Sequence, residues 1–171
     1  SLAVSAAAGD EGAFVALIER HYDRFHRLAW RWCGNSNDAE DVAQDVCVKL
    51  AGAIRSYRGD SAFSTWLHRI AYTTAIDHMR LAQRIVAVEP SEIIRLADSL
   101  SVAPDEPPDG AEIWEAVRKL PPQQRDAVLM VYGEEKSHAE TAVILGCSEK
   151  TVSWHIHEAK KRLRIYLEAV G

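Results

Sequence analysis

Polar and basic side chains recur along the stretch from Ser148 to Arg164, which reads SEKTVSWHIHEAKKRLR. Ser148 is a favourable N-cap, and apolar residues recur at helical spacing from Val152 to Leu163. The predicted helix therefore buries one face and leaves polar groups on the others, at Ser153, Trp154, His157 and Lys161. Hydroxyl, imidazole and ammonium groups of this kind bind phosphates and the edges of DNA bases.

A second, shorter helix is predicted immediately before this stretch. Ser137 can cap it, and Gly146 can supply the positive φ that ends it after Leu145. Two short helices joined by a turn that contains glycine have the proportions of a helix-turn-helix. The second helix is then the one that enters a DNA major groove. An ordinary helical hairpin in a bundle has the same spacing and remains an alternative.

A third group of basic and flat apolar side chains lies on a helix predicted from the sequence AFSTWLHRIAYTTAIDHMRLAQR. The spacing predicts an inner stripe of Phe63, Trp66, Leu67, Ile70, Thr74 and Leu81. It predicts an outer side of His68, Arg69, Tyr72, Ile76, Met79 and Arg80. Cations that bind phosphate, interleaved with rings that stack on bases, are typical of single-stranded nucleic-acid binding. Packing against another helix is the alternative. Asp77 falls on the inner stripe, where we expect it to pair with Arg80.

Two earlier helices complete the first part of the chain. The first is predicted to begin at Gly9 or Asp10 and to end at Gly34. We expect Asn37 to cap the second, with Glu40 in a capping box. The outer face of this second helix gathers Asp41, Gln44, Asp45, Val48 and Lys49. Such a face is either solvated or binds a protein.

The pattern predicts an all-α protein with two small helical domains, since no strand alternation of any length occurs. The chain of 171 residues has 20 Lys and Arg against 25 Asp and Glu. The whole acidic excess lies in residues 85–111, which contain one basic and six acidic residues. Proline and glycine are frequent from Pro104 to Gly110, which disfavours helix. We therefore predict domains at 1–84 and 111–171, joined by an acidic linker at 85–110 with a short helix near 91–100.

Several classes of function are disfavoured by composition. No apolar run is long enough to span a membrane, and the N-terminus has no basic head of a signal peptide. The three cysteines are far apart, as expected for buried, reduced thiols in a cytoplasmic protein. A zinc site built from Cys147, His138, His155 and His157 lacks paired ligand spacing, so we expect no metal and no cofactor. An acid–base set of His68, His78 and Asp77 lacks a nucleophile motif or phosphate loop, so we expect no enzyme.

Two long segments resemble bacterial sigma factors. The sequence YRGDSAFSTWLHRIAYTTAIDHMR, preceded by NDAEDVAQDVCVKL, resembles their promoter-melting domain. The sequence KLPPQQRDAVLMVYGEEKSHAETAVILGCSEKTVSWHIHEAKKRLR resembles their C-terminal helix-turn-helix domain. Because the chain holds only these two domains and a short linker, it resembles the extracytoplasmic-function (ECF) group of the sigma-70 family.

The resemblance implies three sets of binding residues. The set expected to bind the clamp helices of core RNA polymerase is Asp41, Gln44, Asp45 and Lys49. The set expected to open and hold the promoter -10 element is Arg58, Ser64, Trp66, Arg69, Tyr72, Thr73 and Arg80. The set expected to read the -35 element is Lys150, Thr151, Ser153, Trp154, His157 and Lys161. The resemblance also implies control by an anti-sigma factor, and we expect the free chain to be a monomer.

The recognition helix departs from the usual pattern of the family. Relatives often carry arginines along it, whereas this chain has Ser153, His157 and Glu158. Glu158 can accept a hydrogen bond from cytosine but repels phosphate. The -35 preference therefore stays open. Two rival readings also stay open: a sigma mimic that binds only an anti-sigma factor, and a dimeric regulator that uses the helix-turn-helix alone.

Overall fold

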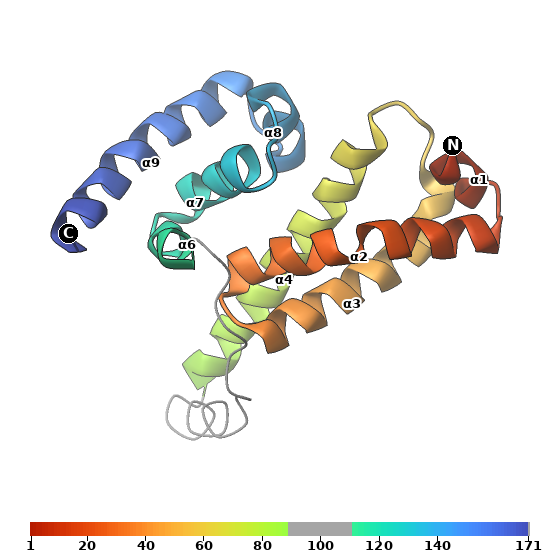
Figure 1. Cartoon of the computed structure of the whole chain (residues 1–171), viewed down its shortest axis with the longest axis horizontal. Coiled ribbons are helices and arrows are strands. Elements are labelled where there is room, and N and C mark those ends of the chain that lie inside the picture. The colour runs from red at the N-terminus through yellow and green to blue at the C-terminus, as the bar shows by residue number, and fades with distance from the viewer. Residues whose placement is uncertain (89–110, 171) are drawn as a thin grey trace. The chain divides into compact units, whose positions relative to one another are not determined.

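The computed structural model describes residues 1–88 and 111–170, with side chains described at 1–82 and 111–165. The described residues form helices joined by turns, and no strand occurs among them (Figure 1). The all-α prediction is therefore confirmed. The predicted linker lies outside the described residues from position 89 onward, and so does the short helix predicted near 91–100. The helix predicted to precede the linker continues to Val88.

The described residues divide into two compact units. The first unit holds residues 1–60 and 70–88, and the second holds 61–69 and 111–170. Helix α4 (Phe63–Val88) therefore contributes its first turns to the second unit and the remainder to the first. The domains predicted from sequence placed residues 63–84 of this helix in the first domain and residues 85–88 in the linker. Contacts between residues far apart in sequence decide this grouping, and spacing along the chain does not report them.

The first unit is built on two long helices that lie side by side, α2 (Glu11–Cys33) and α3 (Ser36–Ala53) (Figure 1). A 3-10 turn, η1 (Ile54–Ser56), follows α3. A short helix that the sequence analysis did not predict, α1 (Leu2–Ala7), packs against α2 and η1. The buried core consists of apolar side chains from α2, α3 and α4, which include Leu28, Trp32, Val42, Val46, Leu50 and Ala75.

Local capping groups set the ends of these helices. The Asp10 carboxylate accepts a hydrogen bond from the Ala13 amide at 3.1 Å, and Gly34, with φ +82°, ends α2. Both ends agree with the prediction. The next cap was wrong, because the Asn35 side chain, and not that of Asn37, accepts from the Asp38 amide at 2.8 Å. Helix α3 therefore begins two residues earlier than the predicted capping box allows.

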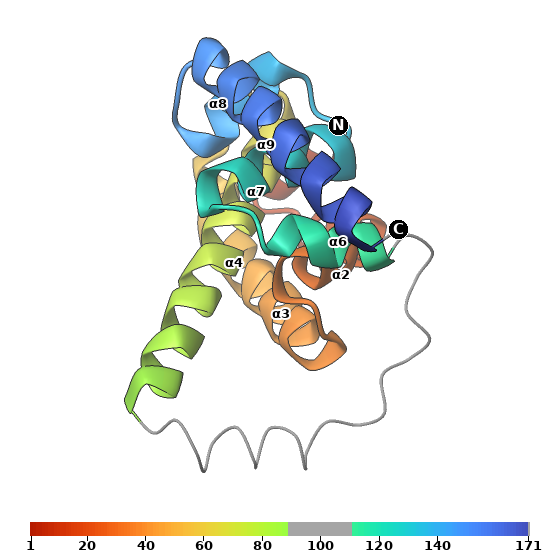
Figure 2. The ribbon, with the colours of Figure 1, turned by 90° about the vertical axis from the view of Figure 1, so that its left-hand side faces the viewer.

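The second unit carries four helices besides the first turns of α4. They are α6 (Ala111–Arg118), α7 (Pro122–Val128), α8 (His138–Leu145) and α9 (Glu149–Val170). A π-helical stretch, η2 (Leu129–Gly133), continues α7. Helix α9 packs against α7 and α8, as Figure 2 shows. The buried side chains of Leu129, Met130, Val152 and Ala159 fill the space between these helices.

Candidate nucleic-acid and protein interfaces

The outer face of α3 is exposed, as the sequence predicted. Its side chains Asp41, Gln44, Asp45 and Lys49 are exposed to solvent, and Val48 beside them is also exposed. The inner face of the same helix buries Val42, Val46 and Leu50, named above, so the rotation of α3 about its axis is fixed. The result is a surface of mainly acidic and amide side chains that includes one exposed apolar side chain, Val48.

Lys49 also forms an ion pair, and this pair corrects a prediction. Its Nζ lies 3.6 Å from Oδ2 of Asp77 on α4. Asp77 is exposed, whereas the sequence analysis placed it on the inner stripe with Arg80 as its partner. Leu81, predicted for the same stripe, is exposed as well. Leu67, Ala71 and Ala75 form the buried face of α4, and helical spacing places Asp77 well to one side of it.

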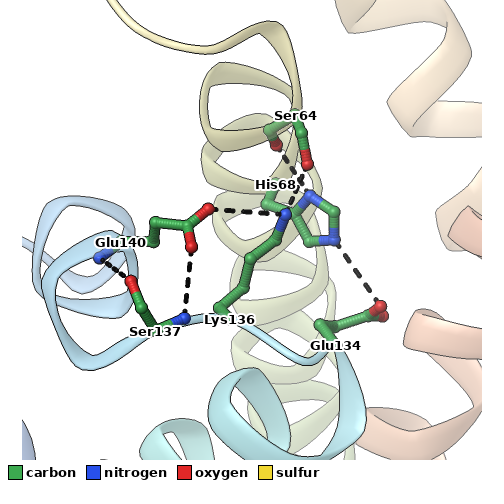
Figure 3. A network of polar contacts seen from close by, with 6 residues as sticks. All are labelled: Ser64, His68, Glu134, Lys136, Ser137 and Glu140. Carbon is green, nitrogen blue, oxygen red and sulfur yellow. Dashed lines mark hydrogen bonds and ion pairs between the residues drawn. The ribbon is translucent and has the colours of Figure 1, made fainter.

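His68 was predicted on the outer side of α4, and that prediction was wrong. Its side chain is only 3% exposed. The ring Nδ1 donates to the carbonyl oxygen of Ser64 at 2.7 Å, and Nε2 lies 3.6 Å from Oε2 of Glu134 (Figure 3). The first turns of α4 are packed inside the second unit, so a position that is outward by helical spacing is covered by residues about 70 positions later in the chain.

Lys136 belongs to the same buried network. Its ammonium donates to the Ser64 hydroxyl and lies 3.9 Å from Oε2 of Glu140 (Figure 3). The side chains of Lys136 and Glu134 are both less than a tenth exposed. Ser64 is therefore held by a cation of the same unit, and its hydroxyl does not face open solvent.

The other predicted -10 residues differ in exposure. Arg58, Arg69, Thr73 and Arg80 are exposed, and Trp66 and Tyr72 are half-buried. Arg69, Thr73 and Arg80 are four and seven residues apart, so they share one face of α4. Trp66 packs against Phe63 with ring centres 5.8 Å apart. Tyr72 meets the buried Trp32 edge to face at 5.9 Å, so its ring is anchored on one side by the core.

The helix-turn-helix is capped by Ser137, Gly146 and Ser148, as the sequence predicted, and Glu140 adds a capping box that was not predicted. The Ser137 hydroxyl accepts from the Glu140 amide at 3.1 Å, and the Glu140 carboxylate accepts from the Ser137 amide at 3.2 Å. Gly146, with φ +72°, ends α8. The Ser148 hydroxyl then accepts from the Thr151 amide at 3.1 Å at the start of α9. These bonds fix the first turns of both helices.

The exposed face of α9 carries the predicted -35 residues. Lys150, Ser153, Trp154, His157 and Lys161 are exposed, and Thr151 is half-buried. The opposite face buries Val152, Ile156 and Ala159, in agreement with the prediction. The carboxylate of Glu158 lies 3.4 Å from the Lys161 ammonium, which partly offsets its repulsion of a phosphate.

The sequence analysis did not predict that His138 contacts the recognition helix. Ring Nδ1 of His138, the first residue of α8, lies 2.8 Å from the Ser153 hydroxyl on α9. The sequence analysis considered His138 only as a zinc ligand. The Ser137 cap gave the available signal, since it places the next residue at the exposed start of α8.

Several titratable groups have pKa values displaced by their surroundings. The hydrogen bonds from the backbone and then the side chain of Ser137 lower the pKa of Glu140. Burial raises the pKa of the Cys47 thiol and that of Cys147. The three cysteines form no disulfide and are half-buried, not fully buried as predicted.

The described part of the chain shows neither a metal-binding cluster nor a membrane-spanning helix. Within 1–88 and 111–170, no group of three or more His, Cys, Asp or Glu side chains is arranged to hold a metal ion. In the same ranges, every helix is too short or too polar to cross a membrane.

Two family models match the chain, one for each part of the sequence. The model of sigma-70 region 2 matches residues 17–85, and that of sigma-70, region 4 matches residues 110–163. The first match contains the exposed face of α3 and the described turns of α4. The second contains the helix-turn-helix and its exposed face.

Similarity to individual proteins extends over more of the chain than either family match does. The chain is 34% identical to the ECF RNA polymerase sigma factor SigM of Mycobacterium tuberculosis, over 91% of this chain and 78% of SigM. It is 33% identical to the ECF RNA polymerase sigma factor SigE of Mycolicibacterium smegmatis, over 96% of this chain and 66% of SigE. The fold is similar to that of CnrH, solved in complex with the cytosolic domain of CnrY. That similarity has a TM-score of 0.74 and 27% identity, and it covers 99% of this chain and 97% of CnrH.

Proposed function

The chain belongs to the ECF group of the sigma-70 family, and on that premise we propose that it directs core RNA polymerase to specific promoters. The observation that carries the proposal is the coincidence of the two family matches with two exposed polar surfaces. One surface is on α3 and α4, and the other is on the helix-turn-helix. No step in this function requires the protein to make or break a covalent bond.

The face of α3 is proposed to dock on the clamp helices of the polymerase. Its exposed side chains are acidic or amide groups, with Lys49 at one end and the apolar Val48 between them. An exposed apolar side chain bordered by polar and charged groups is compatible with a protein interface, whose buried part is apolar and whose rim is polar. The charges would set orientation and association rate, and covering Val48 would contribute apolar burial.

Helix α4 is proposed to capture the melted -10 element. Arg69, Thr73 and Arg80 on one face supply phosphate contacts, and Tyr72 supplies a ring whose other side rests on Trp32. Extruding a base costs a few kcal/mol, and stacking it on an aromatic ring returns about 1–3 kcal/mol. Melting therefore needs several captured bases together with contacts from the polymerase. This is consistent with a subunit that acts on promoters only in the holoenzyme.

Helix α9 is proposed to read the -35 element in the major groove. Its exposed face offers two lysines, a hydroxyl, an imidazole and an indole, so it can position itself on phosphates and contact base edges. The second unit is capped and packed around α9, which gives the recognition helix a rigid support.

Two further elements complete the proposal. The similarity to CnrH, a protein solved with a partner's cytosolic domain, supports control of this chain by an anti-sigma factor. We further propose that the free protein is monomeric and works in the cytoplasm, where its polymerase is found. An anti-sigma factor would then act by competing with polymerase for the chain.

Run-off transcription with purified core polymerase tests the function. The chain is added to core enzyme on a pool of genomic DNA fragments, and transcript starts are sequenced. We expect a set of starts that core enzyme alone does not produce, with shared sequence near -10 and -35. A chain that binds core enzyme but produces no new starts would favour the sigma mimic. A stable dimer in analytical ultracentrifugation that does not bind core polymerase would favour the stand-alone regulator.

A further inference from the structure

The hydrogen bond between His138 and Ser153 joins the two helices of the helix-turn-helix at its exposed surface. Nδ1 of the His138 ring lies 2.8 Å from the Ser153 oxygen. Ser153 is exposed and belongs to the set proposed to read the -35 element, whereas His138 has no role in that proposal. The position of His138 is defined by the backbone, because the Ser137–Glu140 capping box closes around the first turn of α8.

The direction of this bond controls what Ser153 can offer to DNA. A serine hydroxyl has one hydrogen and two lone pairs, and a ring nitrogen of histidine is a donor or an acceptor according to its tautomer. If Nδ1 accepts, the Ser153 hydrogen is used and only lone pairs remain for DNA. If Nδ1 donates, the Ser153 hydrogen is free to be donated outward.

The two states of Ser153 favour different bases. A hydroxyl that can only accept pairs with the amino groups of cytosine or adenine in the major groove. A hydroxyl that donates pairs with guanine O6 or N7, or with thymine O4. We propose that His138 is a positioning residue that sets the hydrogen-bond polarity of Ser153, and so determines the base preferred at one -35 position. This inference rests on the proposed -35 function.

Ser153 lies on the recognition helix, where relatives often carry arginines and this chain has a short hydroxyl instead. A short hydroxyl that rotates freely discriminates poorly, since it can donate to one base and accept from another. A hydrogen-bond partner that fixes the direction of the Ser153 hydroxyl hydrogen lets the residue distinguish between bases without adding a charge. The arrangement is rigid on both sides, because Val152 is fully buried beside Ser153 and Ser148 caps the start of α9.

The test uses the full chain with core polymerase and a promoter library randomised across the -35 element. Ser153→Ala is expected to weaken the preference at one base pair by roughly three- to tenfold, the usual range for one hydrogen bond. His138→Ala is expected to weaken preference at the same base pair. The double variant should lose no more than Ser153→Ala alone, because His138 acts only through the Ser153 hydroxyl.

A matched pair of substitutions tests the polarity itself. In His138→Asp, a carboxylate oxygen lies as many bonds from the backbone as Nδ1 does, and it can only accept. Ser153 must then donate to it, so the base preferred at that position should be cytosine or adenine; the preference moves there if Nδ1 donates in the parent, and is kept if Nδ1 accepts. His138→Asn places an amide there, which can donate or accept, and should stay closer to the parent chain. In a Ser153→Ala background the aspartate shift should vanish, while any general loss of DNA affinity from added negative charge remains.

The outcomes separate this inference from the function on which it rests. A parent holoenzyme with no -35 preference overturns both. A preference that changes with Ser153→Ala but not with the His138 variants overturns only the role of His138. If the His138 variants lower the thermal unfolding temperature and leave base preference unchanged, the hydrogen bond is purely structural and the inference fails.

Discussion

The Lys49 ammonium on α3 lies 3.6 Å from the Asp77 carboxylate on α4, and the two side chains are 46% and 66% exposed. An ion pair between side chains this accessible to water contributes little, because solvent screens it and two long side chains must be held in place. A double-mutant cycle of Lys49→Met and Asp77→Asn should give a coupling below about 1 kcal/mol. Urea unfolding measures it, and 1 M salt should reduce it further. A coupling above about 2 kcal/mol would contradict this expectation.

Asp45→Arg is expected to abolish binding to core polymerase and to leave the fold intact. Asp45 is exposed on α3, so charge reversal buries no new group, but it opposes the charge that the proposed interface presents. The affinity for core enzyme should fall at least about tenfold. Fluorescence-detected binding to core enzyme measures this, with circular dichroism as the check on folding. The matched control is Glu19→Arg, an exposed reversal on α2, and an Asp45→Arg variant that binds like the parent would refute the assignment of this face.

Trp154→Ala is expected to weaken promoter binding without destabilising the protein. The indole is 57% exposed on α9, so its loss should change the free energy of unfolding by no more than about 0.5 kcal/mol. If the ring covers about 40 Å² of a base or a thymine methyl group, the loss is about 1 kcal/mol, or roughly fivefold in affinity. Holoenzyme binding to promoter DNA measures this effect. Val143→Ala, an exposed apolar truncation on α8, is the control, and an equal effect of both variants would place Trp154 outside the DNA contact.

Glu140→Gln is expected to remove an acid-dependent part of the stability. The amide backbone and hydroxyl of Ser137 lower the pKa of Glu140 below its ordinary value of 4.5. The folded state therefore favours the ionised form of the carboxylate more than the unfolded chain does. That contribution is complete above the unfolded pKa and is lost as the pH falls through the lower folded pKa.

Urea unfolding of the parent chain and of Glu140→Gln between pH 3 and 7 measures the difference. The glutamine amide keeps the capping bond but has no charge to interact with the helix terminus. The parent should be the more stable protein at pH 7, by less than about 1 kcal/mol because the Glu140 side chain is 43% exposed and solvent screens its charge. The two proteins should converge toward pH 3, and a gap that widens on acidification would contradict the cause given for the pKa shift.

Helix ends were largely predictable because their causes are local. Asp10, Ser137 and Gly146 each act on residues within a few positions, and the structure shows each in its predicted role. The mistake at α3 has the same local origin. Asn35 and Asn37 each precede an acidic residue by three positions, so the cap rule fits both, and the structure uses the first.

The surroundings of α4 were less predictable, because they depend on residues remote in sequence. Helical spacing assigned His68 to the outer side, but Glu134 and Lys136 cover that turn. The His138–Ser153 bond has the same cause, since it joins residues 15 positions apart across a turn. Spacing fixes which face of a helix a residue occupies, and tertiary contacts decide whether that face meets solvent.

The hydroxyl of Ser64 already accepts a hydrogen bond from the Lys136 ammonium. This bond reduces the free energy that a nucleotide would gain by binding Ser64. Such a nucleotide would substitute for Lys136, so its gain would be the difference between two bonds and not the full strength of the new one. Displacement from Ser64 would leave the Lys136 ammonium beside Glu140, 3.9 Å away, and close to the incoming polyanion. Lys136 therefore competes with DNA for the hydroxyl of Ser64.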